Sequence, residues 1–214
     1  MELVIHRHLW GLEPDARIGW ATWLPRIAAA GYRGVEGMPP PPSQADDFRA
    51  ALDDLGLDFV AQVVTCWPAF GGSPAEHVAS FRAQVERALT FRPTFINAHS
   101  GVDLWSMGDA HAYLREVRRI ERDLGVLVTH ETHRGRLFWN PRDTLALLAE
   151  HEGLSLCADL SHWVTVCERL LDDQEHAVSA IAPHVRHVHA RVGHEQGPQV
   201  NDPRAPEWAR HLAT

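Results

Sequence analysis

Side chains that can bind a metal ion stand at the ends of short apolar segments: Glu131, Asp159, His162 and His189. Their segments read GVLVTHE, LSLCADLSH and VRHVHAR in chain order. Apolar runs that stop at a carboxylate or an imidazole are typical of buried parallel strands whose carboxyl ends open into a site. Three consecutive strands of this kind predict a shared metal centre at one end of a βα barrel. Oxygen and nitrogen donors suit Mn²⁺, Co²⁺, Mg²⁺ or Zn²⁺, so a metal-dependent enzyme is the leading hypothesis.

The two carboxylates each have a structural alternative. Asp159 cannot stay ionised at the end of a buried strand without a metal or a cationic partner. The alternative is that Asp159 caps the next helix while His162 lies at the surface. For Glu131, which can serve as a ligand and as a proton-transfer base, the alternative is a salt bridge to Arg134 or Arg136.

The imidazoles of the last segment alternate along it. His187 and His189 are two residues apart, so they point to the same side of a strand. A single strand histidine is more often a hydrogen-bonded core residue than a ligand. His189 is favoured as a ligand because Glu131 and Asp159 stand at the ends of the two preceding segments.

Strand and helix segments alternate along nearly the whole chain. Strands are expected at 3–8, 32–38, 57–65, 94–99, 126–131, 154–159 and 185–191. Helices are expected at 20–30, 43–55, 75–89, 109–124, 141–150 and from 164 towards 181. This alternation predicts a parallel sheet with right-handed crossovers, and functional residues at the ends of many strands favour the TIM (β/α) barrel, with about seven βα units. A doubly wound sheet is the competitor, but it would normally have a Gly-rich first turn, and HRHLWGLEP has no GxGxxG. No linker divides residues 1–214, so a single domain is expected.

Composition excludes several classes of function. The formal net charge is −8 and every basic residue is arginine, which argues against a nucleic-acid partner and against lysine Schiff-base or P-loop chemistry. The longest apolar runs are too short to span a membrane, and the first residues do not resemble a signal peptide, so a cytoplasmic location is expected. The three cysteines, Cys66, Cys157 and Cys167, form no CxxC pair and are expected to be reduced core residues.

The segments HETHRGR, ADLSHW and HVHARV, in this order, resemble the sugar phosphate isomerase/epimerase family with the xylose isomerase-like TIM barrel. That family includes ketose 3-epimerases, inosose dehydratases and hydroxypyruvate isomerase, and endonuclease IV is a more distant relative. The resemblance implies metal ligands at Glu131, Asp159 and His189, with His162 beside the metal and touching substrate oxygens. It also implies that Arg191 anchors a substrate hydroxyl or phosphate and that Glu131 is one of two acid/base groups in epimerisation.

The chain departs from the family pattern at its C-terminal end. The last strand of the family supplies a second metal-binding Glu, but this sequence ends at Thr214, after a helix-like APEWARHL segment. The barrel is therefore expected to lack its last strand and the domain to be C-terminally incomplete. Glu195 is a candidate replacement. Exposed strand edges make a homodimer conceivable.

Further polar residues near strand ends are candidate substrate contacts: His6, Glu36 and His99. The expected activity is isomerisation or epimerisation of a small sugar or keto-polyol by proton abstraction next to a carbonyl. The alternatives are a metal-dependent phosphodiesterase of the endonuclease IV type, and a barrel that binds a metal or sugar without catalysis.

Overall fold

Seven β-strands follow one another in chain order through one sheet. The computed structural model describes residues 3–12, 19–69 and 71–213. Within these described residues, the strands are ordered β1-β2-β3-β4-β5-β6-β7 across the sheet. The strands are β1 (His6–His8), β2 (Gly34–Gly37), β3 (Asp58–Val64), β4 (Phe95–His99), β5 (Val128–Glu131), β6 (Ser155–Ala158) and β7 (Val185–Val188). The pairs β1–β2, β2–β3, β5–β6 and β6–β7 are parallel. The predicted βα alternation is confirmed.

Helices connect the successive strands. They are α1 (Trp20–Ala29), α2 (Ala45–Leu55), α3 (Pro74–Leu89), α4 (Met107–Leu124), α5 (Pro141–Glu150), α6 (Leu160–Cys167), α7 (Glu175–Ile181) and α8 (Ala209–Ala213). Short 3₁₀ turns lie at Pro42–Gln44, Leu171–Gln174, Ala182–His184 and Pro206–Trp208. Gly56 and Gly125 end α2 and α4 in the left-handed conformation, each with φ 63°, which glycine adopts without steric cost. None of the helices in the described residues combines the length and the apolar character that crossing a membrane requires.

The chain divides into two compact units. The first comprises Met1–Val63 and Arg82–Asn97, and the second comprises Val64–Phe81 and Ala98–Thr214. Each unit has its own buried side chains. The expectation of a single domain stays a prediction.

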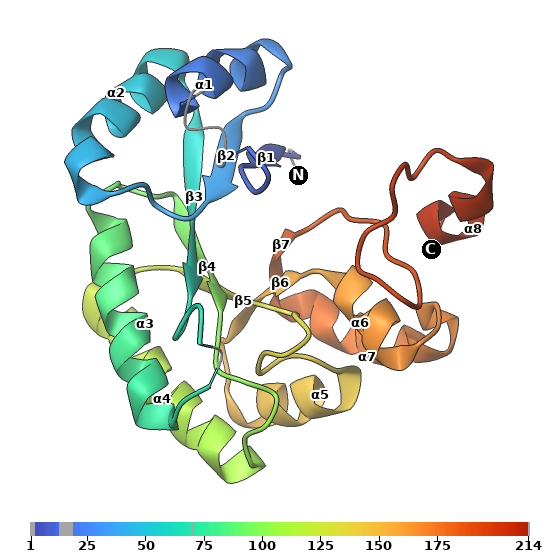
Figure 1. The fold of residues 1–214 in the computed structure, drawn as a ribbon. Helices are drawn as coiled ribbons and strands as arrows, with labels where there is room; N and C mark the ends of the chain where they lie inside the picture. The colour runs from blue at the N-terminus through green and yellow to red at the C-terminus, as the bar shows by residue number, and fades with distance from the viewer. Residues whose placement is uncertain (1–2, 13–18, 70, 214) are drawn as a thin grey trace. The chain divides into compact units, whose positions relative to one another are not determined.

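The first unit is built on a cluster of aromatic rings. Phe48 on α2 meets Phe59 on β3 edge to face, with ring centroids 5.2 Å apart, and Phe91 lies 6.2 Å from Phe48. Trp20, at the start of α1, packs against the same Phe48 at 5.5 Å. Edge-to-face contacts between rings add to the hydrophobic gain of burial. They explain why α1 and α2 lie side by side next to β2 and β3 (Figure 1).

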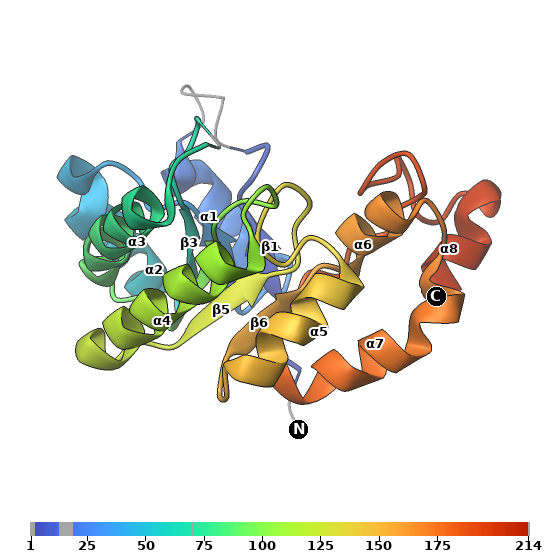
Figure 2. The same cartoon turned by 90° about the horizontal axis from the view of Figure 1, so that it is seen from below.

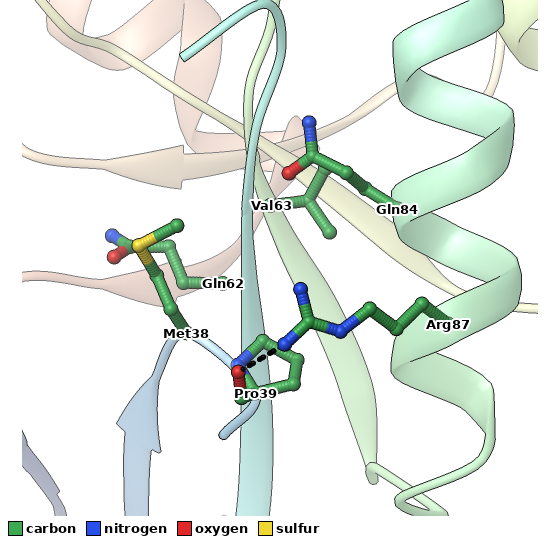
Figure 3. A pocket seen from close by; sticks show the side chains of 6 residues that line it. All are labelled: Met38, Pro39, Gln62, Val63, Gln84 and Arg87. Carbon is green, nitrogen blue, oxygen red and sulfur yellow. Dashed lines mark hydrogen bonds between the residues drawn. The ribbon is translucent and has the colours of Figure 1, made fainter. Parts of the chain in front are cut away.

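A small cavity of about 30 Å³ lies in the first unit, beside β3 and α3 (Figure 3). The Arg87 guanidinium donates to the carbonyls of Pro39 and Pro40 at 2.9 and 2.8 Å. Figure 3 shows this arginine reaching across the cavity to the proline segment. The volume is comparable with the share of one water molecule, so this cavity does not hold a sugar-sized ligand.

The second unit contains the strands of the predicted metal centre. Every residue of β5 and β6 is buried, as expected for parallel strands covered on both faces. Figure 2 shows α4 and α5 next to each other along these strands. Ser106 and Asn140 cap these two helices by accepting the amide hydrogens of Asp109 and Asp143, which satisfies backbone donors at the helix N-termini.

Two predicted boundaries next to the candidate site were wrong. Helix α6 begins at Leu160, directly after Asp159, and not at Val164. The reason is packing: Trp163 is fully buried and its indole N–H donates to the Phe138 carbonyl at 3.1 Å. Strand β7 ends at Val188, before the predicted end at Arg191. One further ladder bond joins the His189 amide to the Ala158 carbonyl at 3.0 Å.

Candidate metal centre

The centre of the site is a pair of buried carboxylates in the second unit. Glu131 is the last residue of β5, and Asp159 follows β6 directly. Their exposed fractions are 1% and 0%. Neighbouring parallel strands bring their carboxyl ends to the same edge of a sheet, so both side chains lie where the sequence predicts them. Two buried carboxylates must be compensated by positive charge.

His189 supplies part of that compensation. Its Nδ1 atom lies 3.6 Å from Glu131 Oε2 and 3.6 Å from Asp159 Oδ2. Burial alone would lower the pKa of His189, but interactions with Cys157, Asp159 and Glu131 outweigh it and raise the pKa above its ordinary value. The two carboxylates therefore stabilise the positively charged form of the His189 imidazole. They would stabilise a divalent metal ion in the same way, because it is also a cation.

His99 is the second imidazole beside Glu131. Its Nε2 lies 2.7 Å from Glu131 Oε2, and His99 itself is the last residue of β4. Burial would raise the pKa of Glu131, yet the adjacent His99 and His189 hold this pKa well below its usual value. Glu131 is therefore an ionised carboxylate at neutral pH. That is the state in which it ligates a metal or accepts a proton.

Asp159 is held by residues on its other side. Arg191 Nη2 lies 3.1 Å from Asp159 Oδ2, and the Ser161 hydroxyl donates to Asp159 Oδ1. Burial opposes ionisation, but His189 and Arg191 outweigh it and lower the pKa of Asp159. Asp159 occupies the N-cap position of α6, yet its side chain makes no capping hydrogen bond there. The capping alternative is therefore not what the structure shows.

His162 returns to the site because α6 starts at once after Asp159. A helix places residues three apart on one face, and His162 Nε2 lies 3.8 Å from Asp159 Oδ2. The ring is buried, and neither of its nitrogens has a hydrogen-bond partner among the described residues. Burial lowers the pKa of His162 to about 4, which leaves a neutral imidazole at physiological pH. A buried neutral imidazole without a partner is ready to ligate a metal or bind a substrate oxygen.

His133 is a member of the site that the sequence reasoning did not select. Its ring lies between two others, with centroids 4.5 Å from His99 and 3.8 Å from His162. Burial and the neighbouring imidazoles lower the pKa of His133 to about 3. The signal in the sequence was its spacing: His133 comes two residues after Glu131, and side chains at that spacing share one side of an extended segment.

The donor atoms fit a divalent ion. One atom each from Glu131, Asp159 and His162 lies within 4.8 Å of the others, and the same holds for His99, Glu131 and His133. The predicted ligands were Glu131, Asp159 and His189, and the structure brings these together as well. Carboxylate oxygens with imidazole nitrogens are donors that Mg²⁺, Mn²⁺, Co²⁺ and Zn²⁺ all accept.

Other predicted contact residues lie elsewhere in the chain. His6 and Glu36 belong to the first unit, where Glu36 is buried and accepts a hydrogen bond from Asn97 Nδ2 at 2.9 Å. Their roles toward a substrate stay predictions. Glu195, the candidate for the missing ligand, pairs with His211 Nε2 at 3.3 Å on a partly exposed surface of the second unit.

A second polar network holds the same two strand ends from their opposite faces. Ser100 and His130, the chain neighbours of His99 and Glu131, are joined by a 2.7 Å hydrogen bond between Oγ and Nδ1. His130 Nε2 lies 2.9 Å from Glu121 Oε1 on α4, and Glu121 in turn pairs with Arg118. The order carboxylate, imidazole, hydroxyl resembles a nucleophilic triad, but Ser100 and His130 are 0% exposed. This buried network of Ser100, His130 and Glu121 therefore holds the ends of β4 and β5 together, and we call it the clamp.

The comparisons with known proteins agree with this architecture. A family model described as "Xylose isomerase-like TIM barrel" matches residues 24–211. A search of curated proteins gave no match.

Solved structures are similar over most of the chain. A D-tagatose 3-epimerase-like protein has 16% identity and a TM-score of 0.68, covering 92% of this chain and 79% of its own. Endonuclease IV from Thermus thermophilus has 16% identity and a TM-score of 0.61, with coverages of 97% and 85%. A xylose isomerase-like TIM-barrel protein from Mycobacterium smegmatis, solved in complex with magnesium, has 16% identity and a TM-score of 0.64, with coverages of 87% and 74%. These similarities confirm the predicted barrel-type α/β fold.

Proposed function

The chain belongs to the xylose isomerase-like TIM-barrel family, and from this membership we propose that it is a divalent-metal-dependent isomerase or epimerase of a small sugar or keto-polyol. The observation that supports the proposal most is the meeting of Glu131 and Asp159, both buried, with His99, His162 and His189. The M. smegmatis neighbour holds magnesium, and the D-tagatose 3-epimerase-like neighbour is named after a sugar epimerase. Both support the proposal by analogy of fold.

The proposed metal site uses Glu131, Asp159 and His189, with His162 next to it. A divalent ion bound there would polarise the carbonyl of the substrate and stabilise the enediolate oxygen. Which ion is bound depends on availability and geometry, because Mn²⁺, Co²⁺, Mg²⁺ and Zn²⁺ share these donors.

The side chains of the site divide the remaining work. Glu131, ionised by its imidazole neighbours, is in the right state to take the proton from the carbon next to the carbonyl. His162 is neutral and buried, so it can hydrogen-bond a substrate oxygen without adding charge. Arg191, which is 28% exposed beside Asp159, would donate to a hydroxyl or phosphate of the substrate. His99 orients Glu131 through their 2.7 Å contact.

The reaction is tested by proton exchange with solvent. The Mn²⁺-loaded chain is incubated in D₂O with a panel of ketohexoses, and proton NMR follows the loss of the C–H signal next to each carbonyl. We expect exchange with at least one ketose, and we expect Glu131→Gln to abolish it. If the Mn²⁺-loaded chain exchanges no ketose and no triose or tetrose analogue, the isomerase proposal is overturned in favour of metal or sugar binding without catalysis.

One observation favours a second candidate, metal-dependent phosphodiester hydrolysis. The groups Glu131–Asp159–His162 and His99–Glu131–His133 share Glu131, and two adjacent metal ions are a common arrangement in nucleases. Endonuclease IV is among the structural neighbours. The net charge of −8 opposes binding to a phosphate backbone. Cleavage of a duplex oligonucleotide with an abasic site by the Zn²⁺-loaded chain would support this candidate over the first.

A further inference from the structure

A second group of candidate ligands, which includes a thiol, lies on β6, on β7 and at the residue that follows β7, and it shares His189 with the carboxylate centre. It consists of Cys157, His187 and His189, each offering one donor atom within 4.8 Å of the other two. Cys157 is fully buried, while the two histidines are half-buried. Sulfur and nitrogen donors select different ions from the carboxylate pair, because a thiolate prefers Zn²⁺, Co²⁺, Cd²⁺ or Cu⁺ over Mg²⁺.

The register between the two strands creates this group. Leu156 pairs with Val185, but the next pair is Cys157 with His187, so the ladder skips Arg186. Without this irregularity Arg186 would stand opposite Cys157. The shift places an imidazole beside the thiol instead, and alternation along the extended segment brings His189 to the same side. Centroids of the rings of His187 and His189 lie 5.2 Å apart, nearly perpendicular.

We propose that Cys157, His187 and His189 form a binding site for a thiophilic divalent ion, and that this site competes with the carboxylate centre for His189. Binding forms the Sγ–metal bond while the thiol proton leaves to solvent. Three protein donors leave one position of a tetrahedral ion for water. The competition, which rests on the proposed function, makes Cd²⁺ an inhibitor that withdraws His189 from the ion at Glu131 and Asp159.

Absorption spectroscopy tests the site directly. Cd²⁺ is titrated into the reduced, metal-free chain, and the sulfur-to-metal charge-transfer band in the ultraviolet is recorded. We expect a saturable band in the wild type and in the double variant Cys66→Ser, Cys167→Ser, which removes the other cysteines. Cys157→Ser should lose the band. No band in the wild type, or a band that survives in Cys157→Ser, overturns the proposal.

A second variant guards against a folding defect in Cys157→Ser. His187→Gln, on a half-buried strand position, keeps the thiol and should weaken Cd²⁺ binding by about tenfold or more, which corresponds to about 1.4 kcal/mol. Circular dichroism verifies that each variant is folded. An unchanged Cd²⁺ affinity in His187→Gln would remove this histidine from the site and contradict the proposal.

The two metal sites are then separated from each other. Asp159→Asn, which damages the carboxylate centre, should keep the Cd²⁺ band, and saturating Mn²⁺ should weaken Cd²⁺ binding to the wild type. Loss of the band in Asp159→Asn would show a single mixed site and overturn the inference. Neither result depends on ketose turnover, so failure here is distinct from failure of the proton-exchange test.

Discussion

At the scale of single residues, the site is defined by the way burial and charge act on each ionisable group. Glu131 and Asp159 stay ionised because imidazole and guanidinium groups offset the cost of burying them. His162 has no such compensation from a hydrogen bond among the described residues and is neutral. The same surroundings therefore contain ionised carboxylates and a neutral imidazole, the protonation states in which these side chains bind a metal ion.

The neutral state of His162 has a consequence for stability at low pH. Burial lowers its pKa from 6.5 to about 4, so between these values the unfolded chain binds a proton that the folded chain does not. Protonation therefore favours the unfolded chain, and the free energy of unfolding falls as the pH falls through that window. In metal-free protein, the free energy of unfolding should fall by about 1 kcal/mol more for the wild type than for His162→Gln between pH 7.5 and pH 5.5.

Urea unfolding of both proteins at the two pH values, in the presence of a chelator, measures this difference. His176→Gln is the matched control, because His176 is exposed on α7 and keeps its hydration on folding. Equal pH slopes for the wild type and His162→Gln would show that His162 is not a buried neutral imidazole.

At the scale of elements, the site depends on how the ends of β4 and β5 are fixed. On one face His99 meets Glu131, and on the other Ser100 meets His130, each pair at 2.7 Å. Because adjacent residues of a strand point to opposite faces, the buried pair holds the register of the pair that faces the site. Glu121 ties His130 to α4.

The clamp is tested with Ser100→Ala. Loss of a buried hydrogen bond should lower the free energy of unfolding by about 1–3 kcal/mol, and the displaced strand ends should also lower the affinity for Mn²⁺. Thr144→Val is the matched control, since it removes a buried hydroxyl on α5 that donates to the carbonyl of the N-cap residue Asn140 at 2.7 Å. Denaturant unfolding and Mn²⁺ titration are measured on both variants. If Ser100→Ala loses stability but binds Mn²⁺ like the control, the clamp does not position the site.

Most elements could be predicted from the sequence because their signals are local. Buried parallel strands are short and apolar, and Asn140-Pro141 or Gly125 mark helix ends directly. The start of α6 was missed because Asp159-Leu-Ser-His shows no helical periodicity, and the burial of Trp163 that fixes it is a tertiary effect. His133 was missed for a related reason: it lies after the end of β5. Its spacing from Glu131 puts both side chains on one side of an extended segment, but its contacts with His99 and His162 are tertiary.

At the scale of the whole molecule, seven strands and the intervening helices are present in the described residues. The proposed metal ligands all belong to the second of the two compact units. The substrate contacts predicted at His6 and Glu36 stay predictions, and the homodimer that exposed strand edges make conceivable stays untested. Metal binding is expected to stabilise at least the second unit, because an ion that binds only the folded chain shifts the folding equilibrium.

This stabilisation is measured by thermal unfolding with and without Mn²⁺. At a free concentration about 100 times the Kd, binding adds about 2.7 kcal/mol to the free energy of unfolding. For a chain of this size that raises the Tm by about 5–11 °C. Addition of a chelator should reverse the increase. A Tm that is the same with Mn²⁺ and with chelator would contradict metal binding by the folded protein.

The central claim is that the two buried carboxylates hold a divalent ion, and the most direct test is a Mn²⁺ titration followed by the electron paramagnetic resonance signal of free Mn²⁺. The titration compares the metal-free wild type with Asp159→Asn and with Asp173→Asn, an exposed carboxylate paired with Arg169. We predict that the wild type and Asp173→Asn each remove a stoichiometric amount of Mn²⁺ from solution and that Asp159→Asn does not. Mn²⁺ that stays free in the presence of folded wild-type protein, or binds equally well to folded Asp159→Asn, would contradict the account.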